Sequence, residues 1–431
     1  MFHLGWFLNG VSLHPRDPIW FGRERRESFG ADLYVELARA LERARFDYLL
    51  ISDNLAIGDK FGGSRDVYLE NAISTPRFDP LPYAAIIAAQ TRHIGVLPTV
   101  STSFVEPFTA ARTAVTLDHI SQGRVGLNLV TSSGDGGARN YGHTEHLEHD
   151  QRYRRAEEWA ELLRQLSRSW EAESISPDIF DPVFADPTRV HPVNFSGEFF
   201  SSAGPLPVPG AGNGELVLSQ AGGSPQGIRF AGRHADTVIA KAASIDAMKT
   251  YRAAIQAEAV AAGRAPDACK VLFIIDPILA ETDEEARAKK DRLRLSAERG
   301  VRNQLALLSS IWGKDLSELP LDEPAPELTT NGHQGMLADF HRIAKGRTLR
   351  EALGVRHFEE AVELVGTPDT VSARMGEIIE EVGGDGFTFE SELNRRTLVE
   401  ITDGLVPALQ KRGLVRSEYA ASTLRGHLTE F

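Results

Sequence analysis

The stretch that decides the fold reads "HIGVLPTVSTSFVEPFTAARTAVTLDHISQGRVGLNLVTS" over residues 93–132. It holds two short runs of apolar and β-branched residues, 93–101 and 124–131, and a longer stretch with helical periodicity lies between them. A strand, a helix and a second strand in this order form the repeating unit of a parallel β-sheet. Near-continuous apolar strands are typical of a sheet that is buried on both faces.

The same alternation recurs along the whole chain. Eight βα units of this kind predict a TIM (β/α)8 barrel. A doubly wound sheet is the alternative, but it usually carries a glycine-rich dinucleotide-binding loop after the first strand, and "FLNGVSLHPRDP" is no such loop. The eight apolar runs lie at residues 2–8, 48–53, 93–101, 124–131, 215–222, 236–243, 271–280 and 386–391.

Three segments rich in proline and glycine interrupt the alternation: 54–79 after strand 2, 174–214 after strand 4, and 309–366 after strand 7. We interpret them as insertions into a single domain that spans residues 1–431. In a barrel enzyme the site lies at the carboxyl ends of the strands, and long loops there are usually functional. We therefore expect the first two insertions to cover that end of the barrel and to roof a substrate pocket.

Composition excludes several classes of protein. The 431 residues are 42% hydrophobic and 25% charged, and the net charge of -13 would repel the phosphates of a nucleic acid. The single cysteine, Cys269, adjoins an apolar run and is expected to be a buried thiol in a reducing compartment. The N-terminal residues lack a basic region followed by a cleavage site, and no apolar run is long enough to span a membrane. We expect a cytoplasmic protein that is not bound to a membrane.

Polar residues gather at the ends of four consecutive predicted strands, where a side chain can point into a site. The segment "SQAGGSPQG" (219–227) also offers flexible backbone N–H groups at the start of a helix, which favours a phosphorylated cofactor. The structural alternative is that each Ser or Thr only caps the helix that follows, as Ser224 does in such a pattern. The polar residues are Asp53 on strand 2, Thr99, Ser101 and Thr102 on strand 3, and Asn128, Thr131, Ser132 and Ser133 on strand 4.

The run "GHTEHLEHDQRY" (142–153) places His143, His146 and His149 three residues apart, which raises the question of a metal. Helical zinc pairs use a spacing of four residues, and a spacing of three across the start of a helix gives no preset geometry. His149 and Tyr153 are four apart, so they share one helical face. We therefore predict no metal here and assign a functional role to His149 alone.

The chain resembles the luciferase-like flavin monooxygenases, in the branch of the nitrilotriacetate, EDTA, dimethyl sulfide and dibenzothiophene sulfone monooxygenases. The resemblance covers nearly the whole chain, and it implies a TIM barrel that takes reduced FMN from a separate NAD(P)H:flavin reductase and uses O2 to oxygenate a small organic substrate. It also implies a homo-oligomer, a dimer or a tetramer. The motifs that carry it are "TVSTSFVEPFTAAR" (99–112), "LDHISQGRVGLNLVTS" (117–132), "ARNYG" (138–142), "HDQRYRRAEEW" (149–159), "GPLPVPG" (204–210), "LSQAGGSPQGIRFAGRHAD" (218–236) and "VGTPDTVSARM" (365–375).

The resemblance also implies roles for individual residues. Asn128 and Thr99 would flank the reactive edge of the flavin and act in catalysis, and Ser224 and Tyr153 would hold its phosphate. The residues that stand where the family contacts FMN are Asp53, Thr99, Asn128, His149, Tyr153, Gly223 and Ser224. Two departures, "LISDNL" at strand 2 and "FLNGVSLHPRDPIW" after strand 1, leave the substrate open among organosulfur compounds, aminopolycarboxylates and aromatic heterocycles.

Other readings remain open at this point. A deazaflavin-dependent dehydrogenase on the same barrel would need no oxygen, a metal-dependent hydrolase would lose its activity to chelators, and a flavin-binding protein without catalytic activity would do neither. His333 and His341 in the third insertion can donate a proton to a leaving group, but a surface histidine in a glycine-rich loop is the commoner case. They are given no assigned role.

Overall fold

The computed structural model of the chain describes residues 1–431 apart from 10–28, 213–214, 243, 355–361 and 392, so part of the segment after strand 1 lies outside the described residues. Eight parallel strands close into a barrel in the order β1-β12-β9-β8-β7-β4-β3-β2. Each of the eight apolar runs overlaps one strand of the barrel, so the predicted TIM barrel is confirmed. The strands are β1 (His3–Leu8), β2 (Tyr48–Ile51), β3 (Gly95–Ser101), β4 (Leu127–Val130), β7 (Leu218–Gln220), β8 (Thr237–Ala240), β9 (Lys270–Ile275) and β12 (Gly386–Phe389).

Helices surround the barrel, and several of them begin with proline at the first helical position, where the missing N–H is not needed. They are α1 (Ala31–Arg43), α2 (Asp66–Glu70), α3 (Pro80–Gln90), α4 (Pro107–Ser121), α5 (Asp135–Asn140), α6 (His149–Ser167), α7 (Pro225–His234), α8 (Ile245–Ala261), α9 (Asp283–Arg299), α10 (Val301–Trp312), α11 (Gln334–Ala344), α12 (Leu349–Gly354), α13 (Pro368–Val382), α14 (Arg395–Val399), α15 (Val406–Lys411) and α16 (Leu424–Leu428). Two 3-10 turns, η2 (Phe61–Gly63) and η3 (Pro187–Arg189), and one π-helix, η4 (Glu400–Leu405), are also present. Two strand pairs, β5 (Phe195–Ser196) with β6 (Ser201–Ser202) and β10 (Ile278–Leu279) with β11 (Val365–Gly366), complete the described elements.

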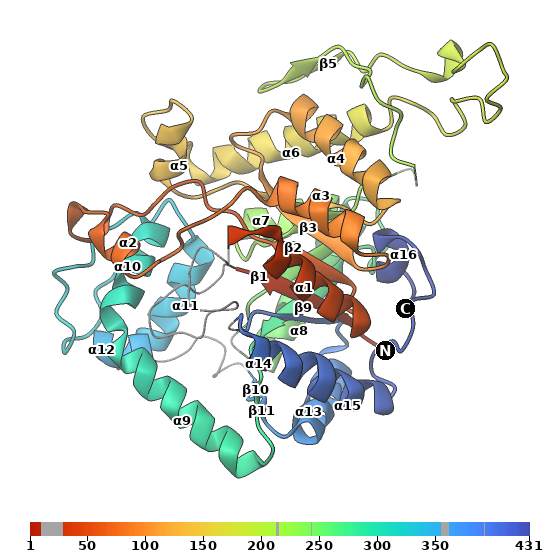
Figure 1. Ribbon diagram of the computed structural model, residues 1–431. Helices are drawn as coiled ribbons and strands as arrows, with labels where there is room; N and C mark the ends of the chain where they lie inside the picture. The colour runs from red at the N-terminus through yellow and green to blue at the C-terminus, as the bar shows by residue number, and fades with distance from the viewer. Residues whose placement is uncertain (10–28, 213–214, 243, 355–361, 392) are drawn as a thin grey trace.

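The barrel interior is filled by side chains that alternate along each strand. Buried side chains from β2, β3, β8 and β9, with Val217 just before β7, meet there, and two leucines of α16 join them. The helix α16 lies beside the barrel, on the right of Figure 1. This packing closes one end of the barrel and leaves the carboxyl ends of the strands for polar side chains. The buried members are Tyr48, Leu50, Leu97, Val217, Ile239, Leu272, Ile274, Leu424 and Leu428.

A cap lies over the carboxyl ends of the strands, on the left of Figure 1. It combines the insertion 54–79 with α10, α11 and α12, and it has a hydrophobic cluster of its own. Tyr68 from the first insertion donates its hydroxyl hydrogen to the carbonyl oxygen of Ala306 at 2.8 Å, which joins the two parts. The expectation that 54–79 covers this end is confirmed, and the third insertion adds to the same cap.

The insertion 174–214 does not help to roof the barrel, so our expectation for it was wrong. It begins beyond the carboxyl end of α6 and returns along the outer faces of α4 and α6. Gly212 N–H donates to Asp118 near the end of α4, and Glu158 on α6 accepts the N–H groups of Glu198, Phe199 and Phe200 in the β5–β6 turn. The sequence predicted an insertion correctly, but contacts with helices far from the strand ends decide where it lies.

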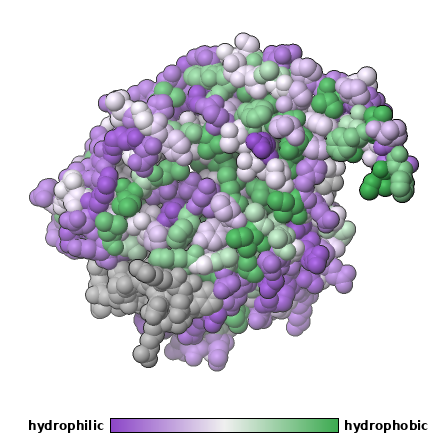
Figure 2. Space-filling model, turned by 45° about the horizontal axis from the view of Figure 1, so that its top comes forward, coloured by the Kyte–Doolittle hydropathy of each residue, from purple (hydrophilic) through white to green (hydrophobic). Residues whose placement is uncertain are grey.

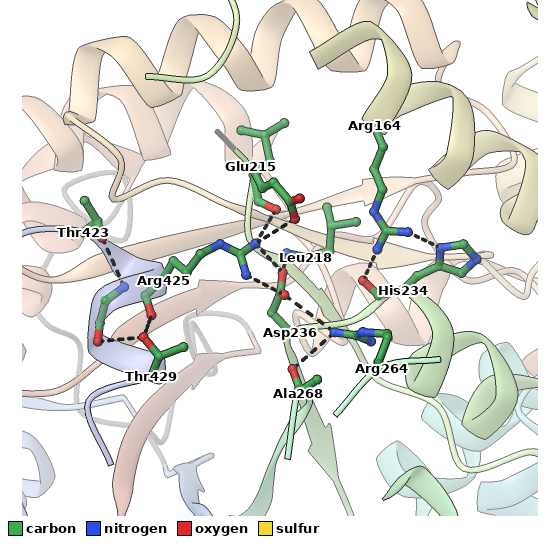
Figure 3. Close-up of polar contacts among 12 residues, drawn as sticks. Arg164, Glu215, Leu218, His234, Asp236, Arg264, Ala268, Thr423, Arg425 and Thr429 are labelled. Carbon is green, nitrogen blue, oxygen red and sulfur yellow. Dashed lines mark hydrogen bonds and ion pairs between the residues drawn. The ribbon is translucent and has the colours of Figure 1, made fainter. Parts of the chain in front are cut away.

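Ion pairs fasten α16 to the amino ends of the strands (Figure 3). Arg425 donates to both carboxylate oxygens of Asp236, at 2.9 and 3.1 Å, and one of these oxygens also accepts the N–H of Leu218 at 2.9 Å. Two-point contact of a guanidinium with a carboxylate fixes orientation as well as distance. The strand β7 and the helix α16 are therefore held in register at the closed end of the barrel.

Two further expectations concern burial. Cys269 is buried as predicted, and burial raises the pKa of its thiol. Among the helices in the described parts of the chain, none is both long and apolar enough to cross a bilayer.

Candidate active site

Four adjacent strands carry the predicted site residues at their carboxyl ends. The barrel places β2, β3, β4 and β7 side by side, so Asp53, Thr99, Asn128 and Ser224 follow one another along half of the rim. The registers pair Thr99 with Asn128 and Asn128 with Ser219 directly across the strands. The structure therefore brings together residues that lie far apart in the sequence.

One hydroxyl hydrogen fixes the side chain of Asn128. Thr99 Oγ1 donates its single hydrogen to the carbonyl oxygen of Ile51 at 2.8 Å, so it can only accept from Asn128, whose Nδ2 lies 2.9 Å away. The amide orientation follows, and Asn128 Oδ1 is left buried with no partner, as is the neighbouring Ser219 Oγ. Buried polar atoms are normally paired, so these two atoms mark a place where a polar ligand would be accepted.

A cradle lies beside them at the start of α7. Ser224 Oγ accepts the N–H of Gly227 at 3.1 Å, and the hydroxyl of Tyr153 lies near the side chains of Ser224, Thr131 and Gln220. Burial raises the pKa of Tyr153, so its hydroxyl stays protonated and can donate. The amide oxygen Oε1 of Gln220 is buried without a partner. Gln220 is a site residue that we did not predict.

Two glycines shape the open side of this cradle. A Cβ on Gly222 would collide with the side chain of Gln220, whereas a Cβ on Gly223 would meet nothing within 4 Å. Tyr251 donates its hydroxyl hydrogen to the carbonyl oxygen of Gly222 at 2.7 Å and so fixes the loop. The cradle thus combines a rigid base, an open face at Gly223 and the positive end of a helix, which suits a phosphate group.

His149 and Tyr153 occupy the first turns of α6, with ring centres 5.1 Å apart, as their spacing predicted. His149 Nδ1 lies 2.9 Å from Asp150 Oδ1, and its backbone N–H donates to Asn331 Oδ1 at 3.0 Å. The latter bond ties α6 to the third insertion. Tyr153 faces the cradle, and the buried ring of His149 lies beside it.

Asp53 stands at the far end of this half of the rim. It is partly buried, burial raises the pKa of its carboxyl group, and the N–H of Asn54 donates to its Oδ1 at 2.7 Å. Arg77 lies near it and donates to Ser52 Oγ at 2.6 Å and to the carbonyl oxygen of Asn9 at 3.0 Å. Asp53 is thus positioned on the rim, two strands away from Asn128.

The opposite half of the rim carries charged residues that we did not predict. Lys241 at the end of β8 lies 3.2 Å from Glu390 Oε2 at the end of β12, an ion-pair contact outside hydrogen-bond geometry. Asn9 at the end of β1 donates to Glu390 Oε1 at 2.6 Å. The rule that a polar residue at a strand end points into the site would have found all three.

The third insertion places the start of α11 against the cradle. His333 precedes α11, and a Cβ on Gly335 would come within 3.8 Å of Gly223. The histidine residue as a whole is exposed, and desolvation of its ring by nearby protein atoms, with the charges of Arg152 and Lys241, lowers its pKa to about 4. His341 lies further along α11, and its Nε2 accepts the N–H of Leu328 at 3.2 Å.

The three histidines of the 142–153 run have separate surroundings. His143 is exposed near the ring of Phe104, His146 reaches the carbonyl oxygen of Thr131, and His149 contacts Asp150. Within the described ranges there is no group of three His, Cys, Asp or Glu side chains arranged to hold a metal ion.

His146 fixes the end of β4 beside the cradle. Its Nδ1 accepts the N–H of Leu147 at 3.0 Å, so its Nε2 carries the hydrogen and donates to the carbonyl oxygen of Thr131 at 3.1 Å. Ser132, the next residue, has a φ of 53°, which is rare for serine. The neutral ring of His146 thus holds a strained turn next to Tyr153, a role that the sequence did not reveal.

A comparison with known families shows which family the chain belongs to. The family model described as luciferase-like monooxygenase matches residues 8–386. The chain belongs to the luciferase-like monooxygenases. The resemblance stated from the sequence motifs is therefore confirmed.

Individual relatives support the predicted branch. The chain is 34% identical over 440 residues to a dibenzothiophene-sulfone monooxygenase of Rhodococcus erythropolis (strain XP), a match that covers 99% of this chain and 96% of that protein. It is 31% identical to a dimethyl-sulfide monooxygenase of Hyphomicrobium sulfonivorans, over 92% of this chain and 83% of that protein. Among solved structures, a riboflavin lyase with modified FMN and substrate riboflavin matches 100% of this chain and 96% of its own, with a TM-score of 0.89 at 30% identity.

The buried, neutral state of His146 predicts a pH dependence of stability. Burial, with the charge of Arg152, lowers the pKa of this ring from 6.5 to about 4, so the unfolded chain binds the proton more readily. The contribution of neutral His146 to the free energy of unfolding is complete above about pH 6.5. It is lost as the pH falls toward 4, by up to about 3 kcal/mol. Urea unfolding from pH 7 to 4 should show a smaller loss in His146→Gln than in the wild type, whereas His143→Gln, at an exposed site, should follow the wild type. An identical loss in all three proteins would contradict this.

Proposed function

We propose that the chain is a cytoplasmic, single-domain monooxygenase that binds reduced FMN and uses O2 to oxygenate a small organic substrate. The observation that carries this proposal is that the cradle at Ser224, after β7, lies beside the unpaired amide oxygen of Asn128 on the adjacent strand β4. The cradle suits the phosphate end of the cofactor, and the amide oxygen of Asn128 suits a polar ring. Family membership supplies the reaction class.

The residues present fit FMN. Ser224, Tyr153 and the open backbone at Gly223 would hold the phosphate at the start of α7, where the helix dipole favours an anion. Gln220 adds a buried amide whose oxygen has no partner in the protein. The loop "SQAGGSPQG" differs from the glycine-rich dinucleotide fingerprint, so the cradle suits a mononucleotide better than FAD or a nicotinamide cofactor.

Bound reduced FMN would supply the activation of O2. The chain contributes position and shielding. Asn128, whose orientation is set by Thr99, presents a carbonyl oxygen toward the interior of the rim, and this acceptor can hold a hydrogen at a fixed place. Asp53 and His149 would contact the same cofactor from either side of that position. The cap over the rim limits access of water, which a reaction of this class requires.

The partners proposed for this enzyme are a separate NAD(P)H:flavin reductase, a small substrate and further copies of the chain in a dimer or tetramer. Organosulfur compounds, aminopolycarboxylates and aromatic heterocycles are the proposed substrate classes. The names of the relatives support the first class, since two of them act on dibenzothiophene sulfone and dimethyl sulfide.

Oxygen uptake tests the proposed function. The purified protein should consume O2 and form product from a panel containing dibenzothiophene sulfone and dimethyl sulfide only when reduced FMN is supplied by a flavin reductase. Reduced FAD should support less turnover and bind less tightly. Turnover without oxygen, driven by a reduced deazaflavin, would instead identify a dehydrogenase, and loss of activity to a chelator would identify a metal enzyme.

The cradle predicts which substitutions weaken cofactor binding. Tyr153→Phe and Ser224→Ala each remove a hydroxyl that would donate to a charged phosphate, so each should weaken reduced FMN binding by about 1–3 kcal/mol. Anaerobic titration measures this directly. Ser224→Thr keeps the hydroxyl and Tyr83→Phe removes one that donates to the carbonyl oxygen of Phe29, so both should bind like the wild type. Wild-type affinity in Tyr153→Phe and Ser224→Ala together would place the phosphate elsewhere.

We expect a substitution of Asn128 to have a different effect from the substitutions in the cradle. Asn128→Ala should leave reduced FMN binding nearly intact, yet slow product formation by about tenfold or more, because the fixed acceptor at the reacting centre is lost. Oxygen consumed without product should appear as hydrogen peroxide. Thermal unfolding of the variant, and of Asn71→Ala outside the barrel, separates this effect from loss of folded protein. A variant that unfolds but keeps normal specific activity in its folded fraction would show that Asn128 is structural.

A further inference from the structure

An arm projects from the body of the protein after α6. Two legs of the chain run side by side, tied by the antiparallel bridges Trp170–Val190 and Ile175–Ala185, and the backbone of residue 171 donates to that of residue 189 at 2.9 Å. The arm lies at the upper right of Figure 1, away from the barrel, and an outlying lobe with hydrophobic surface stands at the right edge of Figure 2. We define the arm tip as residues 177–184.

The arm tip exposes apolar side chains. Ile179 and Phe180 are each 90% exposed, and Val183 and Phe184 are more than half exposed. Four large apolar side chains within six residues form a patch, whereas apolar residues scattered singly over a surface are normal. Nothing in the catalytic proposal uses this patch, because the arm lies on the outer side of α6.

The arm tip is also held in one shape. Asp178 accepts the N–H of Phe180 at 2.9 Å, and Asp181 accepts the N–H of Val183 at 2.8 Å and the hydroxyl hydrogen of Ser176 at 2.8 Å. The N–H of Ser176 donates to the carbonyl oxygen of Phe184 at 3.0 Å and closes the turn. A binding surface that is already ordered loses little conformational entropy when it docks.

Charge argues against a membrane as the partner. Residues 171–186 include five acidic residues and no basic one. The cytoplasmic leaflet of a membrane is negatively charged and attracts basic segments, so this arm would be repelled from it. A protein surface is the better match for exposed phenylalanines with an acidic border.

The area that the arm can bury points to a symmetric pair. A phenylalanine buries on the order of 150–250 Å², so two of them with Ile179 and Val183 supply about 500 Å² on one arm. One arm on a foreign protein would bury about 1,000 Å² in total, below the usual size of a stable interface. In a twofold dimer each subunit gives one arm and receives another, which doubles the area to about 2,000 Å².

We propose that the arm tip docks onto a second copy of this chain in a reciprocal, arm-exchanged dimer. This inference rests on the homo-oligomer that belongs to the proposed function, and it assigns the surface that forms it. Its test needs neither flavin nor oxygen, so the arm contact and the proposed chemistry can fail independently of each other.

Sedimentation over a range of protein concentrations tests the contact. The wild type should have at least twice the 47.3 kDa mass of one chain. The triple variant Ile179→Ser/Phe180→Ser/Phe184→Ser should sediment as a monomer or dissociate at a concentration at least 100-fold higher, with unchanged thermal unfolding of the monomer. Leu69→Ser/Val260→Ser/Val399→Ser is the matched control, because these side chains are more than half exposed on other elements. The control should keep the wild-type mass.

A cross-link identifies the partner. The Ile179→Cys variant is made as isotopically heavy chains, and a benzophenone label is attached to the new cysteine. These chains are then mixed and re-equilibrated with light chains that carry no benzophenone. The native Cys269 is buried, and burial raises the pKa of its thiol, so it should not take up the label. Cross-links from the heavy arm to light-chain peptides support the proposal. Three sedimentation results would overturn the proposal: a monomeric wild type, a triple variant with wild-type mass, or a control variant that dissociates as much as the triple variant. Cross-links found only within one chain, or only to an added flavin reductase, would overturn it as well.

Discussion

The pairing of β1 with β12 closes the barrel, and the arrangement of the site depends on that closure. The parallel register joins His3 to Gly386 and Trp6 to Phe389, across almost the whole length of the chain. A Cβ on Gly386 would collide with the backbone of His3, so the close approach of these strands requires a glycine. Once the barrel is closed, all eight strands point the same way and their carboxyl ends form one rim.

That rim divides into two halves with different chemistry. On β2, β3, β4 and β7 the side chains are neutral hydrogen-bonding groups around Asn128 and the cradle at Ser224, with Asp53 at the edge. On β8, β12 and β1 they are Lys241, Glu390 and Asn9, joined by an ion pair and a hydrogen bond. A ligand held across the rim would meet neutral hydrogen-bonding groups around Asn128 and Ser224 on one side and paired charges on the other.

The sequence predicted much of the fold because its signals are local. Apolar runs such as 93–101 and 124–131 are long and regular, because a barrel strand that is buried on both faces consists mostly of apolar residues. The sequence also singled out Asn128 and Thr99 as polar residues of predicted strands, and the register places them side by side. Their catalytic and cofactor-binding roles come from the resemblance and stay predictions. The roles that the resemblance gives to Asp53, His149, Tyr153, Gly223 and Ser224 stay predictions, although the structure gathers these residues around one part of the rim.

The rest depends on contacts between distant segments. Nothing in the sequence of 174–214 says that Glu158 will hold its turn against α6, and the same proline and glycine content is compatible with a roof. Gln220 and His146 looked ordinary because their partners, Tyr153 and the carbonyl oxygen of Thr131, lie on other elements. Lys241 and Glu390 become a pair only when the barrel brings β8 and β12 to the same rim.

The cap has a hydrophobic cluster separate from those of the barrel in the parts of the chain that the structure describes. Its third insertion is tied to α6 by polar contacts at one residue: Asn331 accepts the N–H of His149, and its carbonyl oxygen accepts a hydrogen from Arg152 at 2.8 Å. A unit with a hydrophobic core of its own can open without unfolding the rest. Where a cap covers the site of a barrel enzyme, the rate at which the cap opens can limit how fast ligands enter and leave. The bonds around Asn331 thus bear on the entry and release of ligands rather than on the chemistry within the site.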